Sequence, residues 1–85
     1  MKVPARTKEL TWEKTGEAYV LLDKETNKNF NLDPISFLVW IQCDGKTDLE
    51  TIVDVFSVNG NRDIVKAAIK GIIDKMEGIG LVKWT

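Results

Sequence analysis

Histidine and cysteine, which most often supply a catalytic base and a thiol nucleophile, are almost absent from this sequence. The chain has no histidine and a single cysteine, Cys43. Without imidazole a thiol lacks its usual general base, and one cysteine cannot form a disulfide within the chain or an ordinary zinc or iron–sulfur site. Cys43 also lies in the apolar run FLVWIQC, which favours a buried structural thiol over a nucleophile.

Asp44 and Asp48 are the remaining candidates for acid–base chemistry, because they lie close together in the sequence. Both stand where one expected helix ends and the next begins, and carboxylates are common at helix ends because they satisfy free backbone N–H groups. Helix-end chemistry explains this pair better than paired-carboxylate catalysis. We therefore expect no enzymatic activity, no cofactor and no metal.

Length and composition favour one small domain with a binding surface. The 85 residues are 44% hydrophobic, with a net charge of −1, which is enough for one core but not for a deep catalytic cavity. No apolar run approaches the ~20 residues of a membrane span, and the N-terminus lacks the apolar segment of a secretory signal. We expect a cytoplasmic protein without a membrane partner, and a lone thiol fits a reducing compartment.

The chemistry that remains is that of main-chain N–H and C=O groups at an open sheet edge. Strands are predicted at residues 9–14, 18–23 and 28–32, joined by short turns, the second of which contains Asn27. Such a meander places the second strand in the centre and the third at an edge. Only Lys28 offers that edge mild protection against further pairing.

Helix signals fill the rest of the chain. Asp33 can cap a helix that begins at Pro34, is apolar almost all round, and is therefore expected to be the buried helix. Gly45 ends it. Thr47 and Glu50 have the spacing of a capping box for a second helix.

A third helix is predicted over residues 62–77, with Asn61 as its cap and Gly78 or Gly80 at its end. Its apolar positions span about 180°, wider than the ~100° stripe that packing on one core requires. The surplus face forms a shallow trough of small or flexible groups, and Gly71 within it costs roughly 1 kcal/mol relative to alanine. The alternative, that the whole face is core, stays open.

These elements resemble a known family in their order and spacing. The resemblance lies in LTWEKTGEAYVLLDKETNKNFNLDP, in WIQCDGKTDLETIVDVF and in the apolar pattern that precedes Gly80-Leu81, and it covers about residues 7–82. The sequence resembles the PqqD-like proteins, peptide-binding chaperones of pyrroloquinoline quinone biosynthesis, and the related leader-peptide recognition domains (RiPP recognition elements). It departs from the family pattern at Asn27, where glycine is common, and at Asp33, where asparagine is common. Both replacements preserve the turn and cap chemistry.

The resemblance implies a winged-helix-like α+β fold, with a three-stranded antiparallel sheet followed by three helices. We expect residues 1–7 to be a flexible tail and residues 8–85 a single domain. In this family the leader of a ribosomally made precursor peptide is bound as an added strand, between the third strand and the third helix. The leader is then presented to a modifying enzyme, often a radical SAM protein.

The expected site combines the open strand with the trough. Main-chain groups of the third strand would pair with the peptide, while the trough would hold its side chains and Lys75 would meet an acidic leader residue. The predicted binding residues are Lys28, Asn29, Phe30, Asn31, Leu32, Ile64, Ala68, Gly71, Ile72 and Lys75.

Two other functions compete with peptide binding. A DNA-binding winged helix would use the third helix for recognition, but that helix has a net charge of only +1 and the chain is slightly acidic, so we expect no nucleic-acid partner. A structural role would pair the open edge with a second copy of the chain. We expect a monomer or a weak homodimer.

Overall fold

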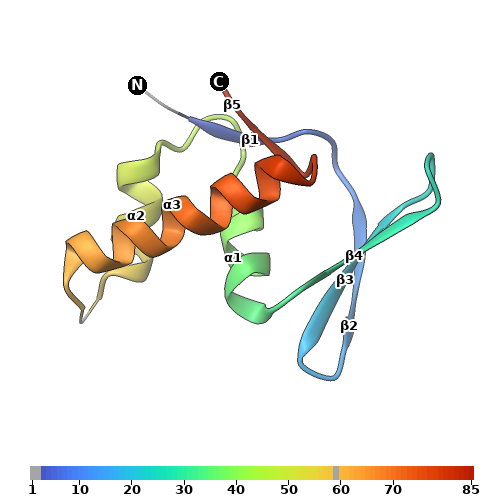
Figure 1. The fold of residues 1–85 in the computed structure, drawn as a ribbon, viewed down its shortest axis with the longest axis horizontal. Helices are drawn as coiled ribbons and strands as arrows, with labels where there is room; N and C mark the ends of the chain where they lie inside the picture. The colour runs from blue at the N-terminus through green and yellow to red at the C-terminus, as the bar shows by residue number, and fades with distance from the viewer. Residues whose placement is uncertain (1–2, 59) are drawn as a thin grey trace.

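The computed structural model describes residues 3–58 and 60–85, which form an α+β fold. A three-stranded antiparallel sheet stands to one side of three helices, and a short two-stranded sheet joins the two ends of the chain (Figure 1). The predicted fold class is confirmed.

The larger sheet is the predicted meander. β2 (Thr11–Thr15), β3 (Ala18–Asp23) and β4 (Lys28–Leu32) follow one another in the order β2-β3-β4. Gly16, with φ 60°, begins the two-residue turn between β2 and β3, and Asn27, with φ 59°, completes the longer turn before β4. Both turns need a positive φ, which glycine and asparagine adopt most readily.

Polar side chains begin all three helices. In α1 (Pro34–Gln42) the Asp33 carboxylate accepts a hydrogen bond from the Ser36 N–H at 2.7 Å. α3 (Arg62–Gly78) is capped as predicted by Asn61, whose side chain accepts from the N–H groups of Asp63 and Ile64.

The predicted capping box of α2 (Leu49–Phe56) is wrong. Asp48 is the cap, and its carboxylate accepts from the Thr51 N–H at 2.8 Å. Thr47 lies one residue too early, where its hydroxyl donates to the Asp44 carboxylate. Glu50 instead forms ion pairs with α3, because the packing of α2 against α3 brings basic side chains next to it.

The prediction that α1 is buried on all sides is also wrong. Phe37, Val39 and Trp40 are buried, but Ile35 and Leu38 are 52% and 47% exposed. In so small a domain the other elements cover only one side of this helix. The outer side therefore remains in solvent despite its apolar sequence.

One core joins both layers. Buried residues of β3 and β4 meet residues of all three helices and of the last strand. Cys43 is fully buried among them, as the sequence predicted, and its Sγ contacts the Val39 carbonyl oxygen at 3.2 Å. The core residues are Leu21, Leu32, Phe37, Val39, Trp40, Cys43, Ile52, Val53, Ile69, Ile73, Met76, Leu81 and Val82.

Part of the expected flexible tail forms a strand. β1 (Pro4–Arg6) pairs antiparallel with β5 (Val82–Trp84), and on its other side the Arg6 N–H donates to the Cys43 carbonyl at 2.8 Å. These partners are remote in sequence, so the N-terminal residues carry no local signal of the pairing. Residues 1–2 of the expected tail lie outside the described residues.

Across residues 3–58 and 60–85, no helix combines the length and apolar character needed to cross a membrane.

Candidate functional site

One side of β4 is an open sheet edge. Within the described part of the chain, β4 is hydrogen-bonded to β3 and to no other strand. The predicted position of this strand at the edge of the sheet is confirmed.

The turn between β2 and β3 determines the direction of the backbone groups across the sheet. Its two-residue loop closes on the pair Thr15 and Ala18. In such a hairpin the closing pair exchanges two hydrogen bonds, and hydrogen-bonded and non-hydrogen-bonded pairs then alternate. Leu21 is therefore one of the β3 residues whose N–H and C=O groups point away from β2 and toward β4.

The same alternation identifies the free groups of β4. Leu21 is paired with Phe30, so Phe30 directs its N–H and C=O toward β3. Asn29 and Asn31, on either side of Phe30, direct theirs toward the open edge. An added strand would find its main-chain partners at these two residues.

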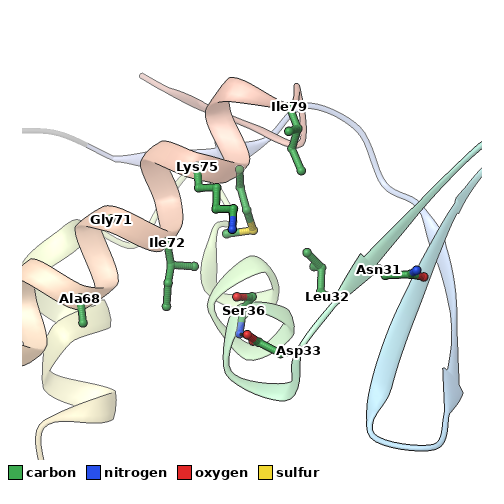
Figure 2. A pocket seen from close by; sticks show the side chains of 10 residues that line it. Asn31, Leu32, Asp33, Ser36, Ala68, Gly71, Ile72, Lys75 and Ile79 are labelled. Atoms are coloured by element: carbon green, nitrogen blue, oxygen red, sulfur yellow. Dashed lines mark hydrogen bonds between the residues drawn. The ribbon is translucent and has the colours of Figure 1, made fainter.

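A cavity of about 410 Å³ borders the end of this edge. It lies between α3, the end of β4 and the beginning of α1 (Figure 2). It is lined by Asn31, Leu32, Asp33, Ser36, Ala68, Gly71, Ile72, Lys75, Met76 and Ile79.

Six of the predicted binding residues line this cavity together. Two of them come from β4 and four from α3, so the structure brings the strand end and the trough to one place. These residues are Asn31, Leu32, Ala68, Gly71, Ile72 and Lys75.

The wide apolar face of α3 is divided between the core and the cavity. Ile69 and Ile73 are buried in the core, whereas Ile72 is half-buried and lines the cavity. Ile64 is 68% exposed, so the alternative that this whole face is core is wrong. The apolar face of α3 is wider than the surface that the core covers, so the remaining apolar residues border the cavity or solvent.

Four predicted binding residues lie outside the cavity. Lys28, Asn29 and Phe30 belong to the part of β4 nearer the hairpin, and the Phe30 side chain packs against the core cluster. Ile64 lies one turn before Ala68 on the same face of α3 but does not line the cavity.

Four lining residues were missed by sequence reasoning. Asp33 was interpreted only as a helix cap and Met76 only as core, while Ser36 and Ile79 carried no signal. Ile79 follows the end of α3, and it lines the cavity only because α3 and the end of β4 lie on two sides of the same space. A search for cap residues that follow an open strand would have found Asp33.

Asp33 and Lys75 are the charged residues among the described lining groups. The pKa of Asp33 is lowered mainly by the hydrogen bond from the Ser36 N–H, and next by a hydrogen bond from the Ser36 side chain. The positive charge of Lys75 lowers it further. The rest of the described lining is neutral, with apolar side chains from Leu32, Ile72 and Met76.

The arrangement suits binding of an extended chain. An open row of backbone groups leads to a cavity with apolar walls and one charge of each sign. Among the residues that the structure describes, no three His, Cys, Asp or Glu side chains gather as a metal site would require. Burial raises the pKa of the Cys43 thiol to about 12, so thiolate is even scarcer than for an ordinary cysteine.

The fold is similar to that of a solved structure titled "TbiB1 in Complex with the TbiA(beta) Leader Peptide". The TM-score is 0.72 with 18% sequence identity, over 93% of this chain and 94% of that chain. At this identity the likeness establishes a common fold. No curated protein sequence matches the chain significantly.

The family model described as "Coenzyme PQQ synthesis protein D (PqqD)" matches residues 18–82. The matched region contains β3, β4 and all three helices, and therefore both walls of the cavity. The chain belongs to the PqqD family.

Proposed function

We propose that the protein is a non-catalytic adaptor for ribosomally made precursor peptides. It binds the leader of such a peptide by β-strand addition to β4 and presents it to a modifying enzyme of the radical SAM type. The single observation that carries the proposal is the continuity of the open β4 edge with the cavity between β4 and α3.

Family membership and fold support this function. The chain belongs to the PqqD family, and a protein of the same fold has been solved with a leader peptide, as its title states. Neither the peptide partner nor the enzyme follows from a fold alone. The geometry of the edge and cavity therefore has to supply the mechanism.

Affinity and selectivity come from different parts of the site. The outward N–H and C=O groups of Asn29 and Asn31 hold the peptide main chain, which any sequence can satisfy. The apolar side chains of Leu32, Ile72 and Met76 receive one peptide side chain and so discriminate among sequences. Strand pairing thereby sets the register in which the peptide is read.

The expected affinity is moderate. A peptide that buries on the order of 400 Å² of apolar surface gains ~10 kcal/mol at ~25 cal/mol per Å². Ordering a disordered peptide and restricting its motion offset much of that gain. Binding in the low-micromolar to submicromolar range would allow the modified product to be released.

The charges of α3 favour this function over DNA recognition. Arg62 pairs with Glu50 and Asp54 on α2, Lys66 pairs with Glu50, and Lys70 pairs with Asp74. These acidic partners reduce the positive field that phosphate binding would require.

Amide NMR titration with candidate leader peptides tests the proposed function. Peptides from precursor genes near this gene are the first candidates. We expect shifts confined to residues 28–32 and the residues of α3 that line the cavity, together with saturable binding in calorimetry. No binding by any candidate, or shifts remote from β4, would overturn the proposal.

Light scattering at several concentrations is the accompanying measurement. A monomer whose β4 edge accepts the peptide agrees with the adaptor function. A stable homodimer that seals β4 and excludes the peptide would favour the structural role instead.

A further inference from the structure

The cavity carries one negative and one positive side chain on different elements. Asp33 comes from the junction of β4 and α1, and Lys75 comes from α3. Figure 2 shows them on opposite sides of the opening, with Leu32 beside the space between them. An inserted peptide side chain would therefore lie between two opposite charges.

The local structure fixes the position of the Asp33 carboxylate. Its Oδ1 accepts the Ser36 N–H at 2.7 Å, and Pro34 begins the helix immediately after it. An ionised carboxylate offers about four acceptor sites, so this cap leaves room for a hydrogen bond from a ligand. Asp33 is ionised at neutral pH like any ordinary aspartate, and the same hydrogen bond lowers the pKa of that carboxyl further.

Lys75 is the basic residue of α3 on the cavity side. Arg62 and Lys66 form ion pairs with acidic residues of α2, and Lys70 pairs with Asp74 one turn along α3. Lys75 instead lines the cavity, and its nitrogen is directed into the opening in Figure 2. Its ammonium has three donors for a peptide carboxylate.

Strand addition fixes the spacing at which a peptide could meet both charges. Residues of an extended chain that point to one face are two positions apart, about 6.8 Å at ~3.4 Å per residue. With one apolar residue against Leu32 and Ile72, which line the cavity, the residues two positions before and after it share its face of the added strand.

We propose that the β4 edge and its cavity select peptides with three residues in alternate positions: an acidic residue, an apolar anchor and a basic residue. The acidic and basic residues lie on opposite sides of the anchor, each two positions from it. The acidic side chain pairs with Lys75 and the basic side chain with Asp33. The order of the two charges then sets the direction in which the peptide lies along β4, because the reversed peptide would oppose like charges. This inference rests on the proposed function and names the class of peptide that it requires.

Selection from a display library of random twelve-residue peptides tests the inference. The full chain, its Asp33→Asn variant and its Lys75→Gln variant are used as targets. Asparagine caps a helix as well as aspartate does, so Asp33→Asn removes the charge and keeps the helix start. Lys70→Gln is the matched control, because Lys70 lies on α3 outside the cavity. Circular dichroism of each variant confirms folding before selection.

We expect the unaltered chain to enrich peptides with the acid–anchor–base spacing in one order. Lys75→Gln should lose the acidic preference alone and Asp33→Asn the basic preference alone, while Lys70→Gln should retain both. For one enriched peptide, each variant should weaken binding roughly two- to fivefold, as exposed ion pairs do, and added salt should reduce the difference.

The outcomes separate the inference from the proposed function. Enriched peptides that share an apolar anchor but no charge pattern would overturn the inference and leave strand addition standing. An acidic preference that survives Lys75→Gln, or a basic preference that survives Asp33→Asn, would also overturn it. No enrichment on the unaltered chain would overturn both.

Discussion

Gly71 of α3 and Leu32 of β4 face the same cavity from opposite walls, and a Cβ at Gly71 would meet no heavy atom within 4 Å outside its own stretch of helix. Nothing in the described fold therefore requires a glycine here. In the middle of a helix glycine is less favourable than alanine. The open space at Gly71 is part of the cavity. Binding of a peptide in that cavity would explain why a glycine stands here.

Gly71→Ala is expected to stabilise the free protein. The substitution restricts the unfolded chain and creates no clash, so the free energy of unfolding should rise by about 0.5 to 1 kcal/mol. Urea denaturation followed by circular dichroism measures the change. A lower midpoint would show that the backbone at residue 71 is not free to accept a side chain.

Larger residues at the same position should weaken peptide binding. Gly71→Leu fills the wall of the cavity, and we expect at least a tenfold loss of affinity without loss of folding. Gly78→Ala is the control, because Gly78 also has open space around it but lies outside the cavity. Equal affinity of the Gly71→Leu variant and the unaltered chain would remove Gly71 from the binding site.

Proline substitutions test strand addition directly. Asn31→Pro removes an N–H that faces the open edge, and edge positions of this kind tolerate proline. We expect a folded protein with about tenfold weaker peptide binding, the effect of one lost hydrogen bond. Isothermal calorimetry measures the affinity.

Two further proline variants control this experiment. Lys14→Pro removes an outward N–H from the opposite edge of the sheet, on β2, and should leave peptide binding unchanged. Phe30→Pro removes an N–H directed toward β3 and should destabilise the fold. If Lys14→Pro and Asn31→Pro lower affinity equally, the peptide does not pair with β4.

The ion pair between Lys8 and Asp23 should make stability depend on pH at both extremes. Lys8 lies between β1 and β2, and its Nζ is 2.7 Å from the carboxylate of Asp23, which is only 7% exposed. Their hydrogen bond lowers the pKa of Asp23 below 3.8 and raises that of Lys8 above 10.5.

The sign of each effect follows from the linkage of proton binding to folding. Asp23 contributes to the free energy of unfolding above pH 3.8, and this contribution disappears as pH falls through its lowered pKa. Lys8 contributes to the free energy of unfolding below pH 10.5, and this contribution disappears as pH rises through its raised pKa. Urea midpoints across pH should show both losses, and Lys8→Gln should reduce both. Lys24→Gln, an exposed control in the hairpin, should not.

The thiol of Cys43 is expected to be unreactive in the folded protein. It is fully buried, and burial raises its pKa to about 12, so thiolate is scarce at neutral pH. Iodoacetamide at pH 8 should label the unfolded chain in urea much faster than the native chain, as mass spectrometry can show. Rapid labelling without urea would contradict the burial of Cys43.

Much of the fold could be predicted from the sequence because its signals are local. A positive φ at Gly16 or Asn27 and a cap at Asp33 or Asn61 depend on residues within one turn. Because the connections between the three strands are short, a meander is the simplest sheet that they can form. The same reasoning located six of the ten cavity residues. Strand order shows which strand edge has no partner, and helix periodicity shows which apolar face exceeds what the core needs.

The remaining features depend on contacts between distant segments. Pro4 pairs with Trp84, and Glu50 forms ion pairs with α3 instead of capping its own helix. Ile79 lines the cavity only because α3 and the end of β4 lie on two sides of the same space. The sequence by itself determined the elements, their turns and the spare edge, since those follow from torsional preference and periodicity. Only the tertiary structure decided which apolar surface became core and which became groove, because burial depends on what the rest of the chain covers.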